Sequence, residues 1–159
     1  MDELLNILRK NARTGIEDIA KMTRSTPAAV AAKIAEYEKA GTIRGYRALV
    51  NEDHLTEDRV TAVIEVKVQP EREGGFDRIA RRISGFPEVL NLHLMSGKYD
   101  LLLFVEGKNL REVARFVSER LATLDGVLST GTHFMLKTYK EDGVLMDGER
   151  ADDRLQVSP

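Results

Sequence analysis

The chain has 159 residues, of which 42% are hydrophobic and 31% charged, proportions typical of a globular protein with one ordinary or two small domains. It has no cysteine, which excludes disulfides, thiol catalysis and cysteine metal sites. The N-terminus lacks the pattern of a signal peptide, and the longest apolar run, 101–105, is too short to span a bilayer. We therefore expect a cytoplasmic protein that does not bind a membrane.

The net charge of −2 is unevenly distributed along the chain. Residues 1–50 hold nine Lys and Arg against six Asp and Glu, whereas residues 51–159 hold fifteen against twenty. This asymmetry suits a DNA-binding domain joined to a domain that does not bind DNA. Chance variation between the two parts would give the same difference, so charge only permits this interpretation.

Two short helices are expected at the N-terminus. Apolar residues at helical spacing after Asp2 indicate the first, over about residues 3–11. Thr14 and Glu17 have the spacing of a capping box, which predicts Thr14 as the N-cap of the second helix.

A third helix is expected to begin at Thr26-Pro27, a hydroxyl N-cap followed by proline, and to end at Gly41. Residues 43–50 should continue as a strand that forms a small wing. Val30, Ile34 and Tyr37 fall on the side of this helix that must face the other two helices, and several alanines occupy the opposite side. This order describes a winged helix-turn-helix, although three helices used only for packing or dimerisation would show the same pattern.

The remaining chain predicts a βαββαβ order, which is the ferredoxin-like pattern. The expected strands cover 60–68, 89–97, 98–107 and 126–139, and the expected helices cover 76–86 and 110–124. A shift of 38 positions superposes the two halves, for example Val63 on Leu101 and Ile83 on Leu121, which indicates two related βαβ halves.

The fold class is therefore α+β, with a winged helix-turn-helix followed by a ferredoxin-like domain. The expected boundaries are 1–50 for the first domain, 51–58 for a linker, 59–140 for the second domain and 141–159 for a C-terminal tail. The tail is interpreted as disordered; the alternative is that its last six residues, RLQVSP, add a short strand or pack on a neighbouring molecule. The strands are apolar at nearly every position, so the sheet face without helices should pair with a second copy. We expect a homodimer, with a ring formed by an octamer of dimers as a further option.

Three motifs follow one another in this chain. They are V-x-x-K-I-x-x-Y-E-x-x-G-x-I-x-G-Y over 30–46, S-G-K-Y-D-L-L-L over 96–103 and D-G-V-L-S-T over 125–130. In this order and spacing, residues 2–140 resemble the Lrp/AsnC (feast/famine) family of transcriptional regulators. The resemblance implies a dimeric DNA-binding regulator, not an enzyme, without a cofactor. It further implies that the ferredoxin-like domain binds a small-molecule effector, usually an amino acid, at a subunit interface.

The resemblance places the effector near the glycine turn between the second and third strands. The effector-binding residues it implies are Ser96, Gly97, Lys98, Tyr99, Asp100, Leu128 and Thr130. Gly97 would allow close approach of a carboxylate, Lys98 would supply a cation and Asp100 would accept from an ammonium group. The alternative is an ordinary β-hairpin in which Asp100 only anchors the loop.

For double-stranded DNA, we expect phosphate contacts from basic and hydroxyl side chains and base contacts from alanine methyl groups. These residues are Arg24, Thr26, Lys33, Lys39 and Arg44 for phosphates, and Ala28, Ala29 and Ala32 for bases. The chain departs from the family pattern at Lys33, where Arg is usual, and in the turn before the third helix, which lacks its customary glycine.

Two other hypotheses remain. The alanine-rich helix motivates an effector-sensing oligomer with weak or no DNA binding. An enzyme similar to sirohaem decarboxylases would need cationic and proton-donating side chains, but the histidines at 54, 93 and 133 form no recognisable catalytic pattern. No metal or phosphate-loop motif is present.

Overall fold

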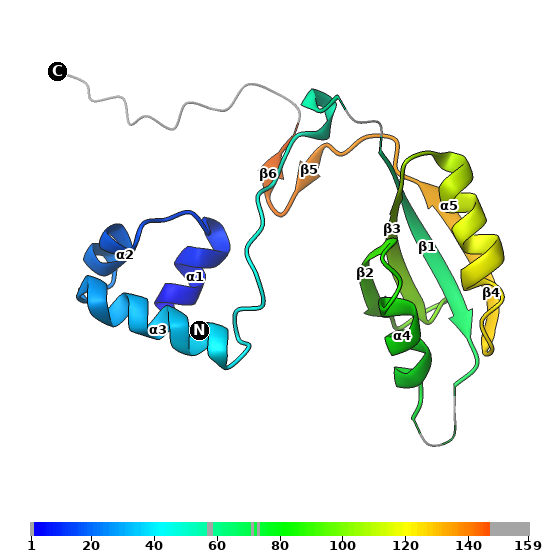
Figure 1. Ribbon diagram of the computed structural model, residues 1–159, viewed down its shortest axis with the longest axis horizontal. Helices are drawn as coiled ribbons and strands as arrows, with labels where there is room; N and C mark the ends of the chain where they lie inside the picture. Colours follow the sequence, from blue (N-terminus) through cyan, green and yellow to red (C-terminus); the bar gives the residue numbers. More distant parts are fainter. Residues whose placement is uncertain (1, 57–58, 71, 73, 147–159) are drawn as a thin grey trace. The chain divides into compact units, whose positions relative to one another are not determined.

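The computed structural model describes residues 2–56, 59–70, 72 and 74–146. The chain divides into two compact units, which we call the head (Met1–Val50) and the body (Asn51–Pro159). Figure 1 shows the helices of the head and the sheet of the body. In the described part of the chain, no helix is both long and apolar enough to cross a membrane.

The head is built from three helices, α1 (Glu3–Lys10), α2 (Ile16–Met22) and α3 (Pro27–Lys39). Their apolar sides meet in one small core. Its buried members are Leu4, Leu8, Ile19, Ala20 and Val30, with Ile7, Ile34, Tyr37 and Ile43 packed against them. The predicted helix-turn-helix is confirmed, and the side of α3 that was expected to face α1 and α2 does so.

Local signals explain where α3 begins and ends. The Thr26 hydroxyl accepts a hydrogen bond from the Ala29 N–H at 3.2 Å, and Pro27 occupies the first helical position, as predicted. At the other end Gly41 has φ +70°, and the Thr42 N–H donates to the Tyr37 carbonyl at 2.9 Å. This is a Schellman motif, in which glycine takes the left-handed conformation at no steric cost.

Two expectations for the head are wrong. The N-cap of α2 is Gly15, because the Thr14 hydroxyl instead donates to the Asn11 carbonyl at 2.8 Å. The expected strand over 43–50 is absent, since none of these described residues forms a strand. Ile43 packs on the head core, and the Tyr46 hydroxyl donates to Glu38 at 2.9 Å.

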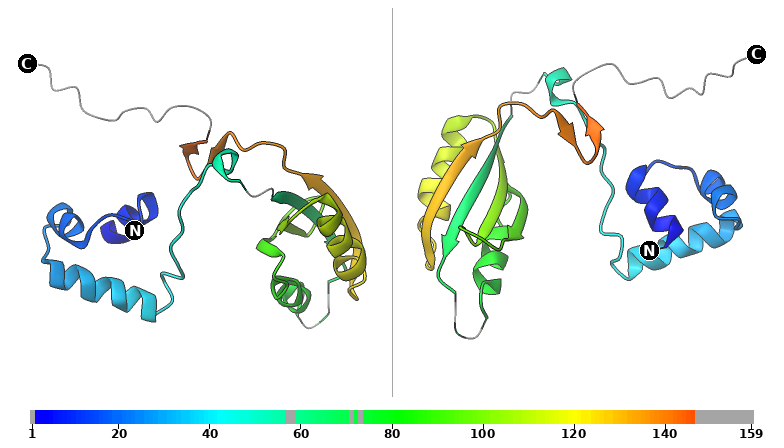
Figure 2. Two further views of the ribbon diagram at one scale, coloured as in Figure 1. Left: turned by 45° about the horizontal axis from the view of Figure 1, so that its top comes forward. Right: turned by 180° about the vertical axis from the view of Figure 1, so that it is seen from behind.

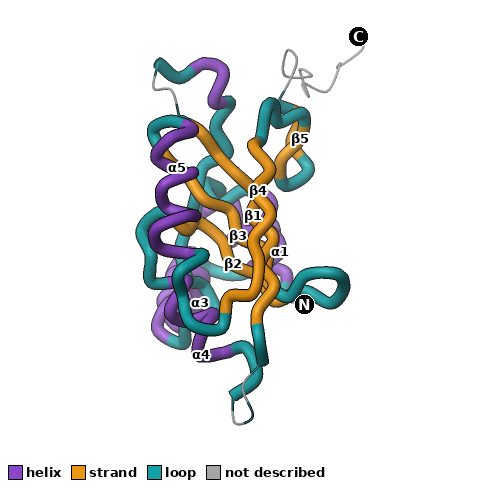
Figure 3. Tube along the Cα trace, turned by 90° about the vertical axis from the view of Figure 1, so that its right-hand side faces the viewer, coloured by secondary structure: helices purple, strands orange, loops and turns teal. Residues whose placement is uncertain are grey.

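The body contains the predicted βαββαβ order. Its elements are β1 (Val60–Val68), α4 (Asp77–Ser84), β2 (Val89–Leu94), β3 (Leu101–Gly107), α5 (Leu110–Phe116) with a π-helical extension (Val117–Leu121), and β4 (Val127–Phe134). A short 3₁₀ turn, Glu52–His54, precedes β1. The four strands form an antiparallel sheet in the order β2-β3-β1-β4, with α4 and α5 on one face (Figure 2, Figure 3).

Residues on β1 and β3 alternate between two environments. Ile64, Val66, Leu101 and Leu103 are fully buried in the core beneath α4 and α5. The other face, which we call the bare face, carries Val63, Glu65, Lys67, Leu102, Phe104 and Glu106 from these two strands. The sequence predicts a uniformly apolar face, but the bare face is mixed, because charged side chains flank the apolar ones.

The internal repeat is one residue out of register in its first strand. The shift of 38 superposes Val63 on Leu101, yet Val63 lies on the bare face and Leu101 lies in the core. Since side chains alternate with period two, a slip of one residue exchanges the two faces of a strand. Both faces carry apolar residues here, which concealed the slip.

The start of the tail is ordered, contrary to expectation. β5 (Lys140–Glu141) and β6 (Val144–Leu145) form a hairpin whose two central residues, Asp142 and Gly143, both have positive φ, at 44° and 88°. Asp-Gly is the favoured pair for such a type I′ turn. The Asn51 side chain donates to the Met146 carbonyl at 2.8 Å and so ties the hairpin to the beginning of the body. The strand considered for RLQVSP falls outside the described residues.

Candidate DNA-binding face and effector turn

One side of α3 is exposed to solvent and carries mainly small side chains. We call it the outward side, and its six exposed residues are Ala28, Ala29, Ala32, Ala35, Glu36 and Lys39. Their side chains form no layer of long hydrogen-bonding groups. A duplex placed against this surface would meet methyl groups at its centre and charged groups at the end of α3.

In the turn between α2 and α3, Arg24 stands at the position where the family usually has glycine. Arg24 has φ +50°, and the hydrogen bonds from Arg24 N–H to the Lys21 carbonyl and from Ser25 N–H to the Ala20 carbonyl form a Schellman motif. Glycine normally occupies this position because a side chain is disfavoured in the left-handed region. Arg24 therefore occupies a strained backbone position next to the N-terminus of α3.

Lys33 is held by its neighbours within the head. Its ammonium group donates to both carboxylate oxygens of Glu36, at 3.1 and 3.0 Å, and lies 4.9 Å from the centre of the Tyr37 ring. These hydrogen bonds to Glu36 raise the pKa of Lys33 above its usual value. The Tyr37 hydroxyl in turn donates to Asp2, which raises the pKa of Tyr37 and lowers that of Asp2.

The remaining predicted phosphate contacts differ in their surroundings. The Thr26 hydroxyl already accepts the Ala29 N–H as the helix cap. The Arg44 guanidinium lies close to Gly41, where an added Cβ would come within 3.0 Å of it. Lys39 is exposed in the last turn of α3. The predicted DNA-binding residues thus lie in the turn before α3 and in α3 itself, except Arg44, which follows the end of the helix.

In the body, Asp100 anchors the loop that we call the effector turn, residues 96–100. Its carboxylate accepts the Val68 N–H at 2.9 Å and lies 3.4 Å from the Lys67 ammonium group, and its side chain is only 17% exposed. Its backbone N–H also donates to the Val66 carbonyl at 3.1 Å. The anchoring role considered from the sequence is therefore present in the fold.

The rest of the effector turn is open. Gly97 has φ +145°, and an added Cβ there would meet nothing within 4 Å. Ser96 and Lys98 are exposed, and Tyr99 is half-buried. A ligand can therefore approach the backbone of this turn without displacing other groups.

Leu128 and Thr130 lie at the same end of the sheet as the effector turn. Lys67 pairs with Ser129 and Val68 pairs with Val127, so Leu128 is the extra residue of a β-bulge and its side chain is exposed. Lys67 also donates to the Lys98 carbonyl at 3.4 Å, and so it connects the turn to β4. Sequence reasoning missed Lys67, whose only signal was its place in an alternating strand.

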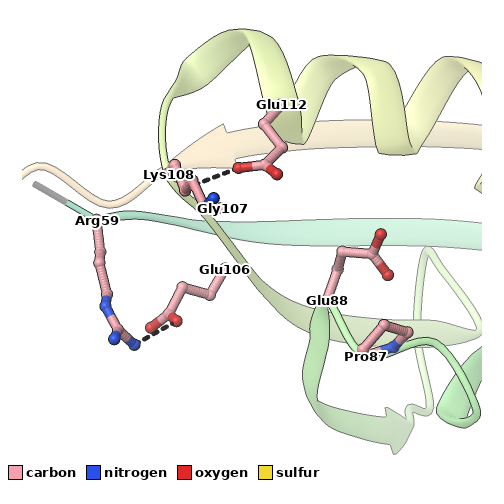
Figure 4. Close-up of a pocket in the computed structure, with 7 residues that line it drawn as sticks. All are labelled: Arg59, Pro87, Glu88, Glu106, Gly107, Lys108 and Glu112. Carbon is pink, nitrogen blue, oxygen red and sulfur yellow. Dashed lines mark hydrogen bonds and ion pairs between the residues drawn. The ribbon is translucent and has the colours of Figure 1, made fainter.

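A depression lies near the other end of β3 (Figure 4). It is lined by Arg59, Pro87, Glu88, Glu106, Gly107, Lys108 and Glu112. Its three glutamates have partners within the chain: Glu106 binds Arg59 at 2.8 Å, Glu112 accepts the backbone N–H of Lys108 at 2.6 Å and Glu88 binds Arg120. None of the predicted effector residues lines it.

The histidines on the sheet are separated from each other. His93 lies on β2 and packs edge-on to Phe104, whereas His133 lies on β4, 3.8 Å from Glu65. Because β2 and β4 are the two edge strands of the sheet, these side chains do not meet. The arrangement gives no support to a catalytic site that uses both.

Comparison with known families agrees with this architecture. Residues 61–145 match the family described as the Lrp/AsnC ligand binding domain, and residues 3–44 match the one described as winged helix-turn-helix DNA-binding. The chain belongs to the Lrp/AsnC family. The resemblance noted from the sequence is confirmed, and so is its implication that the chain is a transcriptional regulator of this type.

Relatives of this Lrp/AsnC protein match over nearly its full length. It is 45% identical over 158 residues to the uncharacterized HTH-type transcriptional regulator YugG of Bacillus subtilis (99% of this chain, 95% of the relative). The leucine-responsive regulatory protein of Haemophilus influenzae is 26% identical over 144 residues (91% and 86%). A solved transcriptional regulator of Neisseria meningitidis in complex with L-Met has the same fold, with a TM-score of 0.68 at 23% identity (89% and 93%).

Proposed function

We propose that this Lrp/AsnC regulator binds double-stranded DNA through α3 and the turn before it. The observation that carries the proposal is the strained backbone of Arg24 at the N-terminus of α3. A long cationic side chain in a position that suits glycine is expected where the side chain has a role of its own. Arg24, Thr26, Lys39 and Arg44 would contact phosphates, with Lys33 joining them when it leaves Glu36.

Base contacts in this proposal come from Ala28, Ala29 and Ala32. Their methyl groups can pack on thymine methyls in the major groove, but they can form no side-chain hydrogen bond to a base. Specificity would therefore depend on DNA shape and on paired half-sites, and binding would favour A·T-rich sequences. Most of the affinity would come from phosphate contacts and would fall steeply with salt.

Selection of bound fragments from the organism's own DNA tests this proposal directly. The selected sites should bind the purified protein with an affinity that falls as salt rises. Arg24→Ala and Lys39→Ala should each weaken binding, whereas Arg111→Ala, which removes the same charge from the exposed side of α5, should not. Binding no tighter than to random duplex at low salt would refute the proposal.

We further propose that an amino acid bound at the effector turn modulates DNA binding. Support comes from the open backbone at Gly97, the nearby Lys98 and Lys67, and the Asp100 oxygen that faces Lys67 and retains acceptor capacity. The effector carboxylate would bind at Gly97 and Lys98, and its ammonium group at Asp100. Ser96, Tyr99, Leu128 and Thr130 would surround its side chain.

A panel of amino acids, tested by calorimetry on the whole protein, would identify the effector. Lys98→Ala should weaken binding of the amino acid found, and Lys108→Ala, at the other end of β3, should leave it unchanged. If Lys98→Ala binds that amino acid as tightly as the wild type does, the effector site is elsewhere.

The assembly we propose is a cytoplasmic homodimer formed through the bare face, from which a ring of dimers can be built. The apolar residues at the centre of this face, Val63, Leu102 and Phe104, would pack against a second copy. Sedimentation should show a dimer for the wild type and a monomer for Phe104→Asp. A variant that remains dimeric would place the interface on another surface.

A further inference from the structure

The two glutamates of α3 have different partners. Glu38 accepts the Tyr46 hydroxyl at 2.9 Å, within the segment that follows the helix. Glu36 lies on the outward side and binds the Lys33 ammonium group through both of its oxygens. Of these two glutamates, only Glu36 places a negative charge on the surface proposed to meet DNA. Glu36 also binds Lys33, one of the cations predicted to contact phosphate.

The Lys33–Glu36 pair contributes little to folding. The two side chains are 41% and 63% exposed, and ion pairs three residues apart on an exposed helix surface are weak. The hydrophobic contacts of Val30, Ile34 and Tyr37 hold α3 in the head without this pair. The pair can open without loss of structure, so that Lys33 can exchange its partner.

A carboxylate and a phosphate oxygen offer the same kind of acceptor to a lysine. While Lys33 is paired with Glu36, the carboxylate neutralises its charge and takes two of its three N–H donors, which weakens its attraction to a phosphate. If Lys33 moves fully to a phosphate, Glu36 stays as an unpaired anion beside the phosphate backbone. Both effects oppose binding at every site, whatever its sequence. They would lower affinity for random DNA as much as for an operator.

We propose that Glu36 competes with DNA phosphate for Lys33 and so lowers the affinity of the head for any duplex. The proposal rests on the DNA-binding function proposed above. Because Glu36 lowers the affinity of a single head for every duplex, stable binding would need sites at which two heads bind together and the DNA shape is favourable. Glu36 is thus a residue that sets affinity without contacting a base.

Glu36→Gln removes the carboxylate and keeps the shape of the side chain. One additional lysine–phosphate contact releases roughly 0.9 counterion, which corresponds to about fivefold tighter binding per head at about 0.15 M salt. We expect this gain for Glu36→Gln, together with a slope of log K against log salt that is steeper by about 0.9. Glu38→Gln, which makes the same change of charge in the same helix, should alter both quantities much less.

Lys33→Ala completes the experiment. In the wild type this substitution should weaken binding only slightly, and in the Lys33→Ala background Glu36→Gln should lose most of its effect. Circular dichroism of each variant confirms that α3 is intact. Equal gains from Glu36→Gln and Glu38→Gln, or a full gain without Lys33, would overturn the inference and leave the DNA-binding proposal standing. Failure of the wild type to bind any duplex would instead refute the proposed function.

Discussion

Replacing Asp100 with alanine tests whether this residue anchors the effector turn when no ligand is bound. The substitution removes the acceptor of the Val68 N–H, and Val68 is only 2% exposed, so water cannot readily replace the lost bond. A buried N–H without a partner costs about 1–3 kcal/mol. The ion pair with Lys67 adds less than about 1 kcal/mol, because the lysine side chain is 44% exposed.

Hydrogen exchange at the Val68 amide measures this loss in the protein without amino acids. A local destabilisation of about 1–3 kcal/mol corresponds to exchange that is faster by roughly 5- to 150-fold. Asp100→Asn keeps an oxygen that can accept the N–H and removes only the charge, so it should change the rate by less than about fivefold. Unchanged protection of Val68 in Asp100→Ala would show that the carboxylate does not anchor the turn.

Three further substitutions probe the head and the core. Arg24→Gly should leave the free energy of unfolding unchanged or raise it by up to about 1 kcal/mol, since glycine suits the left-handed region. The same substitution should weaken DNA binding. A clear loss of stability would contradict the strain inferred at Arg24. Leu103→Ala should destabilise the body by about 2–5 kcal/mol in urea unfolding, against less than about 0.5 kcal/mol for the exposed Leu136→Ala. The pKa of Asp2 is lowered by its bond to Tyr37, so its stabilising effect is present above pH 3.8 and is lost as the pH falls through the lower folded-state value. Asp2→Asn keeps the helix cap without titrating, so its melting temperature between pH 2 and 6 should vary less than that of the wild type; parallel curves would refute this.

Local patterns in the sequence were sufficient to predict most elements of the fold. Thr26-Pro27 and Gly41 delimit α3 because caps depend on a few adjacent residues. The alternation along β1 and the apolar spacing in α4 and α5 depend on burial of one face, which the sequence records directly. The order of these elements then left few topologies for the sheet.

Features that depend on distant partners were not predictable in this way. The wing strand over 43–50 was expected from residue type alone, but a strand also needs a pairing partner, which residue type does not record. The hydrogen bond between Asp100 and the Val68 N–H joins residues that are far apart in the chain, and no local pattern records it.

The hairpin at Asp142-Gly143 did have a local signal in its two turn residues, which the interpretation of the tail as disordered overlooked.

The alanines on the outward side of α3 have a thermodynamic consequence for recognition. An alanine has no rotamers to lose, whereas each arginine or glutamine fixed against a base loses side-chain entropy of up to about 2 kcal/mol. A head that meets DNA through alanine methyls has little to immobilise there, and the counterions it releases add favourable entropy. Its heat of binding should therefore be small, and temperature should affect its affinity for DNA less than salt does.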